Sequence, residues 1–365
     1  MSVHCLPDIR VIYCITNKKN SLRRATMPKI EFCEVEELGM LEDKTEALTI
    51  RSKRTERVRK KQTKKSMRAK VKDPPQDFLR ILPYELVMEI LALLKPSDLF
   101  RLQRASKPFH DFIAQEEARL DRAVSRWRYS SLEKCFRRPV LLADVDPAIH
   151  ELLRSPERQE VLTIHKKSYQ HIRPLEPTEV CTCLTCTLRW SALAIIVDFA
   201  HWQQHLDDGE PIPMIPRGKF PEWNQAIIDA HATIVRKALY SPLWHARLLQ
   251  AHLDSTTRSI RRHTANKGNK RRRFRMTEED VNSGTDDFLA RSGPPSFDIP
   301  YHRDNYYLLE TFMPNRCWSQ DHSRWLYVPA EQHDRDIENV VMWAERRRRS
   351  EGTGFNNHHS TALSL

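Results

Sequence analysis

Three cysteines near the middle of the chain have a spacing that could bind a metal ion. They form the motif Cys181-x-Cys183-x-x-Cys186. A structural zinc ion needs four ligands, and three thiolates can supply most of them. The chain has 8 cysteines and no recognisable secretory signal, so we expect free thiols rather than disulfides.

A fourth metal ligand is missing near this motif. His201 and His205 lie four residues apart on the predicted helix that follows, and they could reach back towards the thiols. Trp202 and Leu206 stand beside them, however, which favours a packed helix face over a pair of ligands. We therefore predict three reduced cysteines that lead into a buried helix, with no metal and no cofactor.

The sequence contains no recognisable catalytic motif. Its 16 histidines make chance pairings with acidic residues inevitable, and none of these pairings repeats a catalytic arrangement. We find no Gly-x-Ser-x-Gly, no glycine loop that could bind phosphate and no His-Glu-x-x-His. With only 8 glycines, the chain has few of the residues that form the loops of such active sites. We expect no enzymatic activity.

Positive charge is concentrated in residues 51–72, and the formal net charge of the whole chain is +12. Such a segment repels itself and stays solvated. It could be a nuclear-import signal, a non-specific nucleic-acid arm or a charged linker. The candidates for nuclear import are Lys53, Arg54, Arg59, Lys60, Lys61, Lys64 and Lys65.

A second basic block, residues 258–275, is followed directly by acidic residues at 278–287. Mixed signs in sequence favour pairing within an exposed loop over a free phosphate-binding surface. Phe274 could stack on a base, but one aromatic residue is weak support. The run from Pro300 to Tyr307 is dense in groups that stack and hydrogen-bond, and it is our best candidate for a recognition surface.

Apolar residues at helical spacing predict an amphipathic helix early in residues 77–113. Leu86, Ile90 and Leu94 recur every four residues. Pro83 precedes them at a position where a helix can begin, because the N–H that proline lacks would be unpaired there in any case. This helix therefore has a clear start and a continuous apolar face.

Two breaks divide the rest of this stretch into two more short helices. Pro96 disfavours the helical conformation at the residue before it, and Ser97 can cap the second helix. Ser106 can cap a third, with Pro108 in its first turn. Three short helices cannot bury all of their apolar residues among themselves. Either a partner or the rest of the chain must cover that surface.

This stretch resembles an F-box. The resemblance rests on Leu82-Pro83, Glu85-Leu86, Ile90-Leu91, Leu94, Pro96-x-Asp98-Leu99, Leu102, Ala105-Ser106 and Phe109. It implies a non-catalytic subunit of a ubiquitin ligase that binds the Skp adaptor and, through it, a cullin, while the remainder of the chain holds an unknown protein substrate. The positions that match the family's contact pattern are Leu82, Pro83, Leu86, Ile90, Leu91, Leu94, Leu99 and Leu102.

The fold class that we predict is mainly α, because 22 prolines and few glycines suit short helices joined by stiff turns. We expect a disordered segment at 1–76, the F-box module at 77–115, a helical substrate-binding region at 116–345 and a disordered tail at 346–365. The region after the module looks like that of uncharacterised fungal F-box proteins.

Charge and hydropathy set our expectations for the cellular location and for an alternative function. The longest apolar run, Ala192–Ala200, is interrupted by Asp198 and is too short to span a membrane. We expect a nuclear or cytoplasmic protein that does not bind membranes. The alternative function is that of a basic nuclear nucleic-acid-binding protein.

Overall fold

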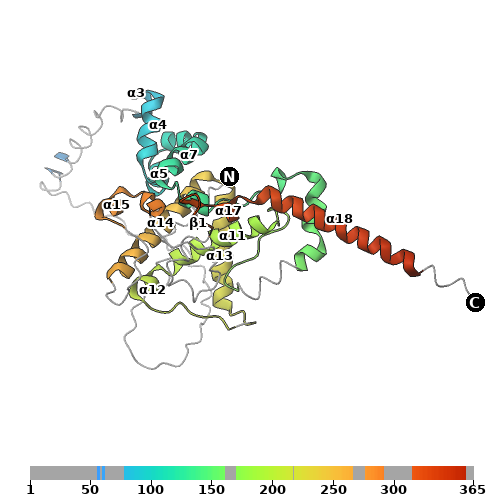
Figure 1. Cartoon of the computed structure of the whole chain (residues 1–365). Helices are drawn as coiled ribbons and strands as arrows, with labels where there is room; N and C mark the ends of the chain where they lie inside the picture. The colour runs from blue at the N-terminus through green and yellow to red at the C-terminus, as the bar shows by residue number, and fades with distance from the viewer. Residues whose placement is uncertain are drawn as a thin grey trace, which may run out of the picture. The chain divides into compact units, whose positions relative to one another are not determined.

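The computed structural model describes residues 56–57, 60–61, 78–160, 170–216, 218–265, 276–291 and 315–358. The chain divides into two compact units, Met1–Pro83 and Tyr84–Leu365. The first contains the short helix α3, Phe78–Ile81. The second contains the other elements labelled in Figure 1.

The second unit begins with four consecutive helices. These are α4 (Tyr84–Leu93), α5 (Pro96–Ala105), α6 (Lys107–Gln115) and α7 (Glu117–Arg128). The first three confirm the predicted group of short helices and the proline breaks between them. α5 packs against α6, and α4 packs against α7.

The helix starts differ in detail from the sequence-based expectation. Ser97 does not cap α5, because the helix begins two residues earlier than such a cap would place it, with Lys95 at the N-cap position and Pro96 in the first turn. Ser106 is the N-cap residue of α6, as predicted, but its side chain makes no capping hydrogen bond. The N–H groups at these helix starts therefore need partners other than the N-cap side chains.

The core of the second unit is formed by three long helices. They are α11 (Leu184–His201), α13 (Glu222–Tyr240) and α14 (Pro242–Ala265), and each packs against the other two. α11 confirms the buried helix predicted after the cysteine motif. α11 is buried on all sides over most of its length, as expected for a helix that is apolar all round. α12 (Gln203–Asp208) follows α11 and ends at Gly209, whose φ of 72° gives a left-handed C-cap.

Other elements connect and cover this core. Before α11 come α8 (Leu132–Cys135), η1 (Leu142–Asp144), η2 (Pro147–Ile149) and α9 (His150–Arg154). After α14 come α15 (Glu278–Ser283), α16 (Asp287–Arg291), α17 (Val328–Glu331) and α18 (His333–His358). An antiparallel hairpin of β1 (Cys317–Ser319) and β2 (Arg324–Leu326) pairs Trp318 with Trp325. The predominance of helix confirms the prediction of a mainly α protein.

Two of the expected domain boundaries do not coincide with a break in the structure. The boundary after residue 115 falls inside a compact unit, and the boundary before residue 346 falls inside a helix. The helices of residues 84–115 belong to the same compact unit as the rest of the chain after Pro83. We expected a disordered tail from residue 346, whereas α18 continues to His358. Among the described residues, no helix is both long enough and apolar enough to cross a membrane.

Candidate docking surface

Helix α4 carries apolar residues on two faces, and the rest of the unit covers only one of them. Val87 and Leu91 face the interior and are each 1% exposed. Leu86, Ile90 and Leu93 are 45%, 40% and 64% exposed. Residues spaced by three and four share one face of a helix, so these three side chains form a continuous stripe, which we call the α4 stripe.

The eight residues that match the F-box contact pattern differ in how much of each is accessible. Within the second unit, Leu86 and Ile90 are exposed, Leu94 and Leu102 are partly buried, and Leu91 and Leu99 are fully buried. Leu82 is partly buried and Pro83 is exposed, and both belong to the first unit.

Two of the eight predicted contact residues, Leu91 and Leu99, are buried within this chain. Leu99 is 0% exposed. Because α7 packs against α4 and α14 packs against α5, this chain itself covers both leucines. Their side chains therefore support the surface from beneath and are not available to another protein.

Sequence reasoning missed the most exposed member of the α4 stripe. Leu93 follows Ile90 by three positions and Leu86 by seven, which places it on the same face. This spacing was available in the sequence, but Leu94 next to it continued the four-residue pattern and was chosen instead. Ile81, in the first unit, is also 58% exposed and was not predicted.

Two residues of α7 hold the C-terminal end of α4. Arg128 Nη2 donates a hydrogen bond of 2.5 Å to the carbonyl of Leu93, and Trp127 Nε1 donates one of 3.3 Å to the carbonyl of Ala92. These carbonyls have no partner within the helix, and a cation at this end complements the helix dipole. Burial lowers the pKa of Arg128, but a guanidinium stays charged in proteins.

The N-terminal end of α4 is held by a polar cluster around Tyr84. The Tyr84 hydroxyl donates to Glu116 Oε2 at 2.8 Å and accepts from Arg119 Nη1 at 2.7 Å. Its ring lies 6.0 Å from that of Phe112, centroid to centroid. With both ends fixed, α4 presents its stripe from a rigid position, and a surface that is already in place loses little conformational entropy on binding.

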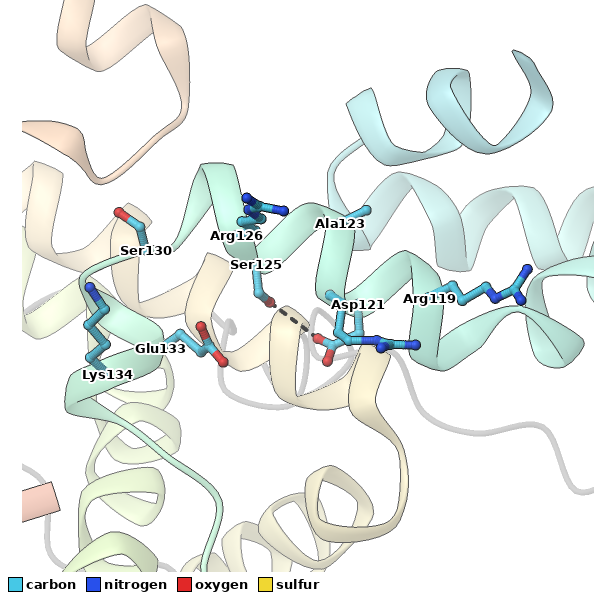
Figure 2. Close-up of a pocket in the computed structure, with 9 residues that line it drawn as sticks. Arg119, Asp121, Ala123, Ser125, Arg126, Ser130, Glu133 and Lys134 are labelled. Carbon is cyan, nitrogen blue, oxygen red and sulfur yellow. Dashed lines mark hydrogen bonds between the residues drawn. The ribbon is translucent and has the colours of Figure 1, made fainter. Parts of the chain in front are cut away.

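A polar hollow of about 620 Å³ lies along α7 and α8. Figure 2 shows its lining side chains and the hydrogen bond of 3.2 Å that Ser125 Oγ donates to Asp121. Burial raises the pKa of Asp121 to about 6. Among the described residues, neither a histidine nor a cysteine lines this hollow.

The three cysteines of the Cys-x-Cys-x-x-Cys motif converge with a histidine that the sequence did not single out. Their sulfur atoms and His333 Nδ1 all lie within 4.8 Å of one another. His333 is the first residue of α18 and follows Cys186 by 147 positions. Hydrogen bonds from Cys183 and Cys186 lower the pKa of the Cys181 thiol to about 4.

The two histidines considered as ligands from the sequence lie elsewhere. His201 packs edge-on against Trp202 with ring centroids 4.7 Å apart, and His205 packs against the same indole at 4.9 Å. Within the described part of the chain, neither belongs to the group of converging ligand atoms. The prediction that this helix face packs is confirmed.

The structure describes only part of the two basic segments. Of the import candidates, Lys60 and Lys61 are exposed, whereas Lys53, Arg54, Arg59, Lys64 and Lys65 lie outside the described residues. So do Phe274 and the run Pro300–Tyr307. In the second basic block, Arg261 pairs with Glu278 at 3.3 Å, which agrees with the expected pairing between opposite charges.

Comparison with known proteins identifies the region that carries the α4 stripe. Residues 79–122 match the F-box-like family. This range includes α4, α5 and α6 and the first half of α7, so it contains both the stripe and part of the layer beneath it. No curated protein and no solved structure matches the chain.

Proposed function

We propose that this chain, which carries an F-box-like domain, is a substrate-recognition adaptor of a Skp-cullin-F-box ubiquitin ligase. The α4 stripe binds the Skp adaptor, the region 116–345 binds an unknown protein substrate, and the chain itself catalyses no step. The observation that carries the proposal is the exposed apolar stripe of α4 inside the region that matches the family.

The size of the stripe sets how much binding energy it can contribute. Complete burial of one large aliphatic side chain contributes about 1.5–3 kcal/mol relative to full exposure. Leu86, Ile90 and Leu93 are already about half covered, so each would contribute on the order of 1 kcal/mol. Association costs several kcal/mol. Further contacts are therefore required, and the partly buried Leu94 and Leu102 are candidates for them.

Leu91 and Leu99 have a different role in this proposal. They are buried within the chain and set the position of the stripe from inside. Leu82 and Pro83, on the other side of the unit boundary, stay predicted contact residues.

Nuclear import is a separate part of the proposal, supported by the charge of residues 51–72 and by the exposure of Lys60 and Lys61. Replacing Arg59, Lys60 and Lys61 by alanine in the fluorescently tagged chain should shift it from the nucleus to the cytoplasm. An unchanged distribution would contradict this part and leave the adaptor proposal intact.

The adaptor proposal is tested by affinity purification of the full chain with the proteasome inhibited. The variant Leu86→Asp/Ile90→Asp should lose the Skp adaptor and the cullin but keep the proteins bound by the remainder of the chain. Phe220→Asp is the matched control, because Phe220 is 61% exposed and lies outside the residues that match the family. Equal recovery of the Skp adaptor with the wild type, the double variant and the Phe220→Asp control would refute the proposal.

A further inference from the structure

The four converging side chains Cys181, Cys183, Cys186 and His333 have the composition of a structural metal centre. We propose that they bind one zinc ion, which fastens the first turn of α18 to the N-terminal end of α11. His333 Nδ1 lies 3.4 Å from the Sγ atoms of both Cys183 and Cys186. The three cysteines are buried, and His333 is partly buried.

The separations between these atoms fit a single tetrahedral ion. Zinc binds sulfur at about 2.3 Å and nitrogen at about 2.0–2.1 Å, so a regular tetrahedron places sulfur and nitrogen roughly 3.5 Å apart and two sulfurs roughly 3.8 Å apart. The two sulfur–nitrogen distances of 3.4 Å agree with the first value. The 4.8 Å limit on all pairs leaves no room for several iron atoms between the ligands, as an iron–sulfur cluster requires.

Each of the three sulfur atoms accepts a hydrogen bond from a backbone N–H group. Val140 donates to Cys186 Sγ at 3.4 Å, Cys183 donates to Cys181 Sγ at 3.4 Å, and Cys186 donates to Cys183 Sγ at 3.3 Å. Such bonds stabilise thiolates and orient metal ligands. Cys183 is also the N-cap residue of α11, where the positive end of the helix dipole favours a negative sulfur.

The charges around the motif suit a bound cation. Three thiolates and one zinc ion carry a net charge of about −1 when the histidine is neutral. Arg158 is fixed beside the motif, because its Nε donates to the carbonyl of Thr182 at 3.0 Å. Its guanidinium can balance the remaining charge.

The surroundings identify the centre as structural rather than catalytic. The cysteines lie in an apolar cluster with Leu142, Val145 and Leu153, and Ile337 and Val340 of α18 pack against it. Four protein ligands leave no position open for water or substrate, which is the arrangement of a structural site.

A second contact shows that α18 is docked in the orientation that such a centre needs. The backbone N–H and the hydroxyl of Thr185 both donate to Asp336 Oδ2, at 2.7 and 2.6 Å. Asp336 and His333 lie on the first turn of α18, so the carboxylate binds the start of α11 and the imidazole faces the thiols.

The direct test uses the wild-type full chain, purified without chelator in the presence of zinc. Elemental analysis should find one zinc per chain, and X-ray absorption at the zinc edge should show three sulfur ligands and one nitrogen ligand. A folded chain without zinc, or a first shell dominated by oxygen, would overturn the proposal. This test requires no variant and does not depend on binding of the Skp adaptor.

Variants then test the identity of the fourth ligand. His333→Ala should weaken zinc binding by at least about tenfold, since even changes to residues behind the ligands cost 10–100-fold. His205→Ala is the matched control and should bind zinc as the wild type does. Equal zinc affinity in the two variants would show that His333 is not a ligand.

Discussion

The side chain of Gln250 makes a reciprocal pair of hydrogen bonds with Ser97. The backbone N–H of Ser97 donates to Gln250 Oε1 at 2.9 Å, and Gln250 Nε2 donates to Ser97 Oγ at 3.0 Å. Ser97 lies in the first turn of α5, whose N–H groups have no partner within the helix. A residue of α14 therefore replaces the side-chain cap of α5 and joins the F-box-like helices to the helical core.

Removal of this link should destabilise the whole unit. In Gln250→Ala, the Ser97 N–H loses its partner at a partly buried position, which costs about 1–3 kcal/mol. Chemical denaturation of the full chain measures this loss. Gln204→Ala, at an exposed position of α12, is the control, and equal unfolding free energies for the two variants would show that the link contributes nothing.

Truncation to alanine should destabilise the chain strongly at Leu99 and only slightly at Leu86. Leu99 is fully buried, so Leu99→Ala leaves a cavity and should lower the free energy of unfolding by about 2–5 kcal/mol. Leu86→Ala, on the half-exposed stripe, should lower it by no more than about 1 kcal/mol. Denaturation curves of both variants check this, and a large loss in Leu86→Ala would mean that the stripe is covered by this chain.

Asp121 should make stability fall as the pH rises. Burial raises its pKa to about 6 from the ordinary value of about 3.9 for an aspartate, so the folded state holds this proton more tightly than the unfolded state. The resulting stabilisation is present below about pH 4 and is lost as the pH rises through about 6. Asp121→Asn keeps an acceptor for Ser125 without the charge. At pH 7.5 it should therefore be more stable than the wild type by on the order of 1–3 kcal/mol.

Thermal denaturation at pH 5 and pH 7.5 measures this effect, with Asp208→Asn at an exposed position as the control. Parallel pH profiles for the wild type and Asp121→Asn would contradict the assignment. Other buried carboxyl groups titrate in every one of these proteins, so the difference between the profiles isolates Asp121.

The helices of the F-box-like region could be predicted from the sequence because their signals are local. Proline at 83, 96 and 108 and apolar residues at spacings of three and four fix where α4, α5 and α6 begin. Which face of α4 stays exposed could not be predicted in the same way. Both faces are apolar, and the covering helices α7 and α14 decide between them.

The candidate metal centre shows the same limit. The spacing of the three cysteines resembles part of a zinc site, but we predicted no metal because no fourth ligand lies near them in the sequence. The fourth side chain follows 147 residues later, at the start of a helix with no local metal signal. His201 and His205 were nearer in sequence and lie on another face, packed against Trp202. Only the packing of α18 on α9 and α11 brings His333 to the thiols.

The affinity of the purified full chain for the purified Skp adaptor tests the central claim most directly. We predict that Leu86→Asp/Ile90→Asp weakens binding by at least about a hundredfold, since burying each unpaired charge and losing each aliphatic contact costs several kcal/mol. Phe220→Asp should bind as the wild type does, and all three proteins should have the same helical circular dichroism. Unchanged affinity in the folded double variant would contradict the account.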